Sequence, residues 1–268
     1  MTPNAAFAGT VPANYEKYLG PILFEPYALD MVERLKSRKL KNVLELACGT
    51  GRVTAHLVNL LAEGGKLIAT DINGDMISVA KEKVSSNKIE WQVADAQQLL
   101  FDDESFDHII CQYGVMFFPD KLKAFKEALR VLQQEGMYIF NTWDEMEFNP
   151  RTTIIRSIME EMFITDAPDF LKKGPYSFYN KNEIKNLLQE AGFKNIEIET
   201  VKKTSSYNDE DEFINGFIEG SPLSAFVKDK PEDVKTELKK RVRNALKEQD
   251  KYYGKQVPLQ ALVCTAFK

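Results

Sequence analysis

Cysteine and histidine are scarce in this sequence, which limits the chemistry available to it. Among 268 residues there are three cysteines and two histidines. Cys48, Cys111 and Cys264 are widely spaced and form no Cys-x-x-Cys pair, so we expect neither disulfide bonds nor a bound metal. A reducing, cytoplasmic compartment is therefore favoured. Two histidines also leave little for a zinc site or for a Ser-His-Asp triad.

Long apolar runs and an excess of positive charge are also missing. No apolar run approaches the length of a transmembrane helix, and the first residues lack the charged region and apolar core of a secretory signal. The net charge is −5 and the isoelectric point is about 5.4, unlike the basic surface of nucleic-acid binders. We therefore expect no membrane span and no nucleic-acid partner, in a protein that is a monomer or a homodimer.

Apolar runs alternate with amphipathic stretches between residues 42 and 142. The spacing of the apolar residues predicts helices from Val53 to a stop at Gly64, from 73 to 84 and from 119 to 132. Alternation of this kind is typical of an α/β fold with a doubly wound, mostly parallel sheet and helices on both faces. Seven strands are predicted, at 43–47, 66–71, 89–93, 106–111, 136–140, 193–201 and 258–267.

The remaining segments are predicted to be a cap and two insertions within a single domain of residues 1–268. The cap starts irregularly over residues 1–20 and contains an amphipathic helix at 22–36. The two insertions interrupt the alternation, and we expect them to form a helical lid. The cap comprises residues 1–40, and the ligand-binding core comprises residues 41–143. The insertions are residues 144–180 and residues 205–255. Further helices are predicted at 151–163, at 182–191 with Gly192 as C-cap, and around 234–246.

A glycine loop between the first strand and the following helix marks the ligand site. The sequence Gly49-Thr50-Gly51 lies in a strand–turn–helix layout, which brings backbone N–H groups up to a small ligand. No Gly-Lys-Ser/Thr follows the loop, and this excludes a P-loop. A dinucleotide or S-adenosylmethionine fits a glycine loop in a doubly wound sheet.

Two residues near the loop separate these ligands. The dinucleotide fingerprint requires glycine or alanine where Thr54 stands. Glu45, in the strand before the loop, would repel a pyrophosphate, whereas S-adenosylmethionine has no phosphate and carries positive charge. Asp71, at the end of the next strand, would bind ribose hydroxyls in either case. The residues favour S-adenosylmethionine, and an NAD(P)-dependent oxidoreductase stays the alternative.

Five motifs, in order, resemble the class I S-adenosylmethionine-dependent methyltransferases of the ubiquinone/menaquinone-biosynthesis type. They are Glu45 to Gly51, Asp71 with Ile72, Asp95-Ala96, Phe106-Asp107 with Gln112 to Asp120, and Arg130 to Gly136. The resemblance covers about residues 14–143. It implies a Rossmann-like fold and transfer of a methyl group from S-adenosylmethionine, with S-adenosylhomocysteine as the product.

The resemblance also implies which residues hold the cofactor. Asp71 would bind both ribose hydroxyls, with Ile72 and Met76 flanking the adenine. Asp95 would accept a hydrogen bond from the adenine amino group, and the Ala96 N–H would donate to the ring. The contacts expected near the methionine part come from Glu45, Ala47, Cys48, Gly49, Gly51 and Gln112.

The acceptor side is less well defined by the sequence. Tyr113 and Phe117 follow the fourth strand, at the edge where such folds bind ligands, and we expect them to line the acceptor site. Tyr18 resembles an N-terminal tyrosine that closes over the cofactor. The acidic composition and aromatic insertions favour a small or lipophilic acceptor, and no residue is identified as a general base. A non-catalytic S-adenosylmethionine-binding protein stays a further alternative.

Overall fold

The computed structural model describes residue 7 and residues 9–268, which form two compact units. The sheet unit consists of Tyr27–Asp144, Phe178–Val201 and Ala261–Lys268. The helical unit consists of the described part of Met1–Pro26 together with Glu145–Ser177 and Lys202–Gln260. The division into a cap, a core and lid insertions stays a prediction.

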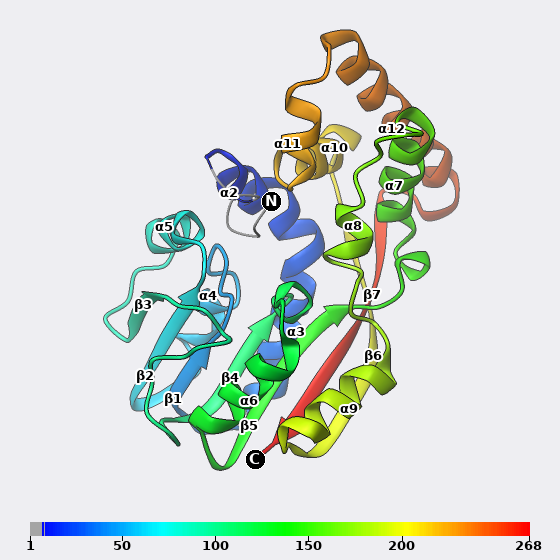
Figure 1. The fold of residues 1–268 in the computed structure, drawn as a ribbon. Helices are drawn as coiled ribbons and strands as arrows, with labels where there is room; N and C mark the ends of the chain where they lie inside the picture. Colours follow the sequence, from blue (N-terminus) through cyan, green and yellow to red (C-terminus); the bar gives the residue numbers. More distant parts are fainter. Residues whose placement is uncertain (1–6, 8) are drawn as a thin grey trace. The chain divides into compact units, whose positions relative to one another are not determined.

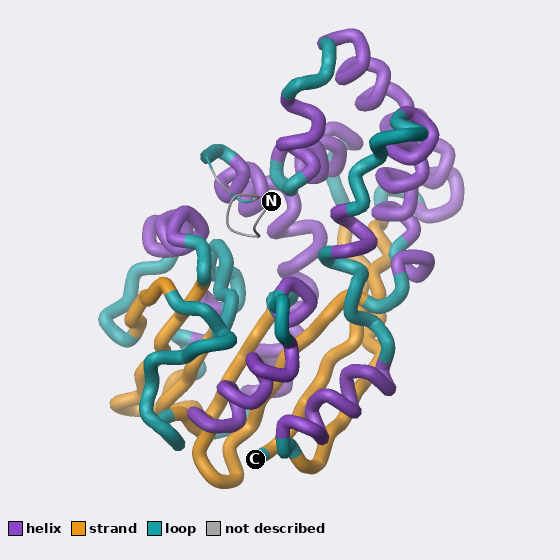
Figure 2. The backbone as a smooth tube through the Cα atoms, viewed as in Figure 1, coloured by secondary structure: helices purple, strands orange, loops and turns teal. Residues whose placement is uncertain are grey.

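The sheet has seven strands in the order β3-β2-β1-β4-β5-β7-β6. The pairs from β3 to β5 are parallel, and β7 is antiparallel to β5. This order confirms the predicted α/β fold with a doubly wound, mostly parallel sheet of seven strands (Figures 1 and 2). The strands are β1 Leu40–Glu45, β2 Leu61–Asp71, β3 Ile89–Val93, β4 Phe106–Gln112, β5 Leu132–Trp143, β6 Lys194–Ser206 and β7 Gln256–Phe267.

Helices cover both faces of this sheet because successive side chains of a strand point to opposite sides. Along β5, Met137 and Ile139 join a buried cluster with Met31 of α3. Tyr138 and Phe140 face the other way, and their rings lie 6.1 and 5.6 Å from the ring of Phe125 in α6. In Figure 1, α6 and α9 accordingly lie in front of the strands and α3 behind them. The helices of the sheet unit are α3 Glu25–Leu35, α4 Thr54–Leu57, α5 Gly74–Lys83, η2 Val115–Phe117, α6 Lys121–Val131 and α9 Lys181–Ala191.

The helix after the glycine loop is shorter than predicted. It ends at Leu57, and Leu61 already belongs to β2, where it pairs with Leu40 of β1. The apolar residues at 57, 60 and 61 suit a helix, but pairing with β1 satisfies the same backbone groups in a strand. The expected stop of α9 is confirmed, because Gly192 follows it with φ at 107°.

The helical unit is built from three separate stretches of the chain. The expected irregular start falls mostly on residues 1–6 and 8, which lie outside the described residues, and the chain is helical from Val11 onward. The helix η1 is a π-helix and contains Pro21, which lacks the backbone N–H that the other residues of a helix can donate. The predicted helices near 151–163 and 234–246 are present as α7 and α12. The helices are α2 Val11–Asn14, η1 Tyr15–Phe24, η3 Met146–Phe148, α7 Pro150–Met162, α8 Phe170–Lys173, α10 Glu210–Glu219, α11 Leu223–Lys228 and α12 Glu232–Tyr253.

Arg151 of α7 organises the interior of the helical unit. It is 1% exposed, and each of its three side-chain nitrogens donates a hydrogen bond. The acceptors are the carbonyls of Leu246, Gly254 and Gln256, and the carboxylate of Asp250 lies 2.8 Å from Nη2. The side chain therefore fixes the end of α12 and the turn that leads to β7.

Among the described residues, no helix combines the length and the hydropathy that crossing a membrane requires.

Candidate active site

The strand register brings polar side chains together at the carboxyl edge of the sheet unit. Asp71 ends β2, and Gln112 ends β4, where it pairs with Asn141 of β5. Glu45 ends β1 and pairs with Ala69 and Ile110, each two residues before Asp71 or Gln112. Paired residues in parallel strands share a face, as do residues two apart in one strand. These four polar side chains therefore occupy the same face across four neighbouring strands.

The glycine loop approaches this face with its backbone. Ala47, Gly49 and Gly51 all have positive φ, at 51°, 55° and 72°. The loop is fixed by hydrogen bonds from the Cys48 N–H to the Thr70 carbonyl and from the Gly51 N–H to the Cys48 carbonyl, both 2.9 Å. A Cβ at position 51 would lie 3.0 Å from the Cβ of Ala80 and 3.2 Å from the Trp91 ring. Only glycine suits this position, since both the φ and the space exclude a side chain.

Asp71 is held in place by backbone donors. Its Oδ2 accepts from the Gly49 N–H and its Oδ1 from the Asn73 N–H, both at 2.8 Å. The residue is 8% exposed; burial raises the pKa of its carboxyl, and the backbone donors oppose that rise. A carboxylate oxygen can accept more than one hydrogen bond. Asp71 therefore retains acceptor capacity for a diol while its orientation is fixed.

Glu45 is buried and contacts Thr54, which follows the glycine loop. It is 1% exposed, and the Thr54 hydroxyl donates to its Oε2 at 2.6 Å. Burial raises its pKa to about 8, against the Thr54 hydrogen bond and the charge of Lys83. No local pattern predicts the contact with Thr54, because the contact depends on the tertiary path of the loop. Thr54 occupies the position of the missing third glycine and serves as the partner of Glu45.

The residues expected to surround an adenine lie after β2 and β3. Ile72 is 45% exposed and Met76 is buried at the start of α5, which Asn73 caps by accepting from the Met76 N–H. Asp95 is half-buried and accepts from the Gln97 N–H at 2.8 Å, and Ala96 is buried. This arrangement leaves an apolar side chain at one strand end and a carboxylate at the next.

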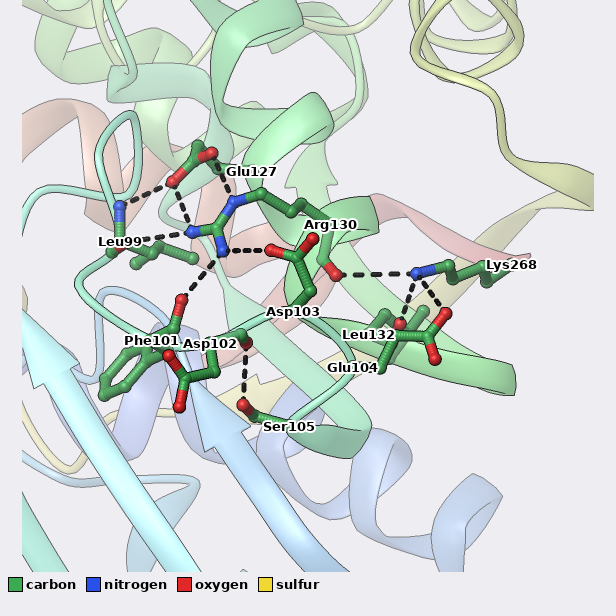
Figure 3. A network of polar contacts seen from close by, with 10 residues as sticks. All are labelled: Leu99, Phe101, Asp102, Asp103, Glu104, Ser105, Glu127, Arg130, Leu132 and Lys268. Atoms are coloured by element: carbon green, nitrogen blue, oxygen red, sulfur yellow. Dashed lines mark hydrogen bonds and ion pairs between the residues drawn. The ribbon is translucent and has the colours of Figure 1, made fainter.

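Arg130 of α6 fixes the loop that follows Asp95 (Figure 3). Its guanidinium donates to the carbonyls of Leu99 and Phe101 at 2.9 and 2.8 Å, and to Asp103 at 2.7 Å. Glu127, one turn before Arg130, accepts from both the guanidinium and the Leu99 N–H. The motif that starts at Arg130 is therefore structural: it anchors the segment that carries Asp95.

An aromatic cluster begins where β4 ends. Tyr113 has a positive φ of 53°, and its ring stacks on Trp143 with 4.2 Å between the ring centroids. Tyr27 of α3 meets both rings nearly at right angles, at 5.7 and 5.6 Å. Phe117, the other residue expected to line the acceptor site, is half-buried in η2. Trp143 and Asn141 were not expected at the site, and their only signal in the sequence is their alternate positions at the end of a strand.

Cys48 and Tyr18, which were also expected to contact the cofactor, lie in other parts of the structure. Cys48 packs against Ala69 and Ile77 in a small buried cluster. Tyr18 belongs to η1 of the helical unit, where the Lys17 ammonium lies 4.8 Å from its ring centroid. Closure of Tyr18 over a cofactor stays a prediction. No three His, Cys, Asp or Glu side chains come together as metal ligands in the described part of the chain.

Comparison with known proteins points to one family. The model of the ubiE/COQ5 methyltransferase family matches residues 27–205. The demethylmenaquinone methyltransferase of Staphylococcus carnosus (strain TM300) is 28% identical over 207 residues, which cover 71% of this chain and 84% of that protein. The demethylmenaquinone methyltransferase of Staphylococcus aureus (strain JH9) is 27% identical over 205 residues, which cover 70% of this chain and 83% of that protein.

Solved structures show the same fold. Haemonchus contortus phosphoethanolamine N-methyltransferase 2, in complex with S-adenosyl-L-methionine, superposes with a TM-score of 0.63 at 18% identity, covering 98% of this chain and 57% of that one. A putative methyltransferase from an antibiotic biosynthesis pathway of Anabaena variabilis superposes with a TM-score of 0.63 at 18% identity, covering 90% of this chain and 97% of that one.

Proposed function

The chain belongs to the ubiE/COQ5 methyltransferase family, and from this premise we propose that it methylates a planar, oxygen-bearing aromatic small molecule such as a hydroquinone. It is an S-adenosylmethionine-dependent methyltransferase that acts on a small molecule. The hydroquinone class is suggested by the curated relatives, which are named demethylmenaquinone methyltransferases. The proposal concerns the class of acceptor, because sequence identity near 28% does not identify one particular substrate.

The aromatic cluster of Tyr27, Tyr113 and Trp143 is the observation that carries this proposal. It lies directly after Gln112, at the end of the row of polar residues. Tyr113 and Trp143 are 5% and 3% exposed, so this end of the site is apolar. These rings are buried against one another, so an acceptor beside them would meet an apolar aromatic surface. A planar ring therefore suits this region better than a flexible, highly charged acceptor.

The residues at the carboxyl edge fit S-adenosylmethionine. The fixed carboxylate of Asp71 keeps acceptor capacity for two ribose hydroxyls, and the backbone at Ala47, Gly49 and Gly51 is open to close approach. Glu45 is a buried carboxyl whose ionised form a neighbouring cation would favour and a phosphate would disfavour. We infer the remaining contacts from the family resemblance: they involve Tyr18, Cys48, Ile72, Met76, Asp95, Ala96 and Gln112.

Positioning is the main task of these residues. When bound, S-adenosylmethionine supplies a methyl group on a sulfonium that is already a good leaving group. The chain therefore needs to align the acceptor atom with the methyl group and to exclude water. Alignment of two reactants can contribute roughly 7–11 kcal/mol. Methylation of a phenolic oxygen or an adjacent ring carbon releases one proton, and we assign no general base for it.

We also propose a reducing compartment, the cytoplasm, as the place of action. All three cysteines are free and buried, so the fold does not depend on an oxidised pair.

The proposed function is tested with radiolabelled S-adenosylmethionine. Calorimetry should show micromolar binding of S-adenosylmethionine and no binding of NAD or NADP. Label from the methyl group should enter a 1,4-naphthohydroquinone under reducing conditions, and it should not enter phosphoethanolamine. Transfer only to amines would contradict the aromatic acceptor. Failure to bind S-adenosylmethionine would contradict the cofactor site itself.

A further inference from the structure

We propose that Asn141 binds the methyl acceptor directly, by donating a hydrogen bond from its Nδ2 to an oxygen of that acceptor. The inference deepens the proposed function and rests on it, because it concerns the same site and the same class of acceptor. It adds a residue that determines which acceptors react and how they are oriented.

The position of Asn141 in the sheet is the first argument. Asn141 pairs with Gln112 across the β4–β5 ladder and shares its face. Counted from Asp71, the row of polar residues crosses β2, β1 and β4 and ends at Asn141 on β5. A nucleoside held at Asp71 occupies the β2 end of this row. The side of the row that remains for an acceptor is therefore the end where Asn141 lies.

The hydrogen bonding of the Asn141 amide is the second argument. Its Oδ1 accepts from the Tyr113 N–H at 2.9 Å, and since a backbone N–H can only donate, this contact fixes which amide atom is the oxygen. The Nδ2 is buried, and the described residues offer it no hydrogen-bond partner. Asn141 as a whole is 0% exposed. A buried N–H group without a partner is destabilising, so the amide is placed to gain from a ligand oxygen.

The loop after β4 holds this amide still. A Cβ at Gly114 would lie 2.5 Å from the Cβ of Ala47 and 2.7 Å from the Cys111 Sγ, so the loop lies directly against the glycine loop. Tyr113 is held in a left-handed conformation by the Asn141 oxygen and by the stack on Trp143. Rotation of the Asn141 amide would break the contact with Tyr113. The Nδ2 group therefore stays a donor with a fixed direction.

A fixed donor selects for an oxygen and against an ammonium group, which can only donate. In the transfer step, an electron pair of the acceptor forms the bond to the methyl carbon, the carbon–sulfur bond breaks, and its electron pair stays on sulfur. The acceptor releases one proton to solvent. Negative charge on a phenolic oxygen increases as this proton leaves, and a hydrogen bond from Nδ2 stabilises that charge.

Two substitutions separate the two halves of the amide. Asn141→Asp keeps an oxygen for the Tyr113 N–H and removes the Nδ2 donor, whereas Asn141→Leu removes both. Tyr138→Phe is the matched control, because Tyr138 lies on the same strand and faces α6. The measurements are kcat and KM for naphthohydroquinone, the dissociation constant of S-adenosylhomocysteine, and the melting temperature. A pH series for Asn141→Asp tests whether a protonated aspartic acid restores the donor.

We expect Asn141→Asp to lower kcat/KM for the acceptor at least tenfold at pH 8 while S-adenosylhomocysteine binding changes less than threefold. Its activity should recover relative to wild type as the pH falls, which a purely structural role would not produce. Tyr138→Phe should retain wild-type kcat/KM. Wild-type kcat/KM in Asn141→Asp, with a loss only in Asn141→Leu, would overturn the direct contact and leave Asn141 as a support for Tyr113.

A second readout does not depend on turnover. In the complex with S-adenosylhomocysteine, the Asn141 side-chain amide resonances, assigned with Asn141→Asp, should shift when phenol, catechol or hydroquinone is added. If wild type shows no turnover of any hydroquinone, the proposed function fails for that acceptor, and this titration still decides the role of Asn141. A shift with any of these oxygen compounds supports the inference. No shift with any of them, or a full shift with S-adenosylhomocysteine alone, overturns it.

Discussion

Arg151 of the helical unit and the polar residues at the carboxyl edge of the sheet unit are used in opposite ways. In the helical unit, every side-chain nitrogen of Arg151 is bound to the protein, and Asp250 is bound in turn. In the sheet unit, Asp71 keeps acceptor capacity beyond the backbone donors that fix it, and the Nδ2 of Asn141 has no partner among the described residues. Saturated groups stabilise a fold, whereas groups with spare capacity bind ligands. The family match over residues 27–205 includes most of the sheet unit and ends before α10.

Arg151→Met should give the largest change, and only in stability. It leaves the buried Leu246 carbonyl and the part-buried Gly254 and Gln256 carbonyls without this donor, while the Tyr207 hydroxyl still donates to Asp250, so the free energy of unfolding should fall by about 3 kcal/mol. Binding of S-adenosylmethionine by the protein that remains folded should change by less than about threefold, since none of these contacts is in the sheet unit. Urea unfolding and calorimetry measure the two quantities. A loss of affinity comparable to that of an Asp71 variant would break the contrast between the units.

Asp71→Asn should weaken cofactor binding, in contrast to Arg151→Met, and it should also lower stability, because the new NH2 group faces the N–H of Gly49 or of Asn73. Its amide keeps one oxygen acceptor, but the charge that strengthens hydrogen bonds to the ribose is lost. We expect S-adenosylmethionine to bind on the order of 100-fold more weakly. Asp250→Asn is the control in the helical unit and should leave the affinity unchanged. Equal affinities in wild type and Asp71→Asn would remove Asp71 from the site.

Gly51→Ala should show a smaller effect that depends on contacts at the loop. A Cβ there would press on Ala80 and Trp91 at a φ of 72°, so the loop must shift and affinity should fall about tenfold. Gly64→Ala has a similar φ of 69° with no atom within 4 Å of the new Cβ. It should lose comparable stability and keep its affinity in calorimetry. Equal affinity losses in the two variants would mean that strain alone, not the loop contacts, weakens binding.

Glu45→Gln should change the dependence of stability on pH. The pKa of Glu45 is about 8 in the folded chain against an ordinary 4.5, so between these values the folded state binds more protons than the unfolded state. Stability from this group is therefore lost as the pH rises through that window, at no more than about 1.4 kcal/mol per pH unit. Thermal unfolding from pH 5 to 8.5 should show a shallower decline in the variant. Identical pH profiles would show that Glu45 does not titrate in this range.

The sequence predicted the parts of the site that local patterns determine. The alternation of apolar runs predicted β3 at Ile89–Val93, and the strand–glycine–helix layout predicted the loop and Asp71 at its side. The prediction of secondary structure was wrong at Leu61, where the apolar spacing fits a helix but pairing with Leu40 makes a strand. The contact of Thr54 with Glu45 depends on the tertiary path of the loop, and the burial of Asn141 depends on how the strands pair in register. Spacing along one chain does not contain that information.

A crystal structure of the complex with S-adenosylhomocysteine tests the central claim most directly. It should show both ribose hydroxyls on the carboxylate of Asp71, the adenine beside Asp95 and Ala96, and the sulfur on the side of Gln112 and Asn141. A nucleoside bound elsewhere, or an Asp71 carboxylate that contacts only Gly49 and Asn73 in the complex, would contradict it.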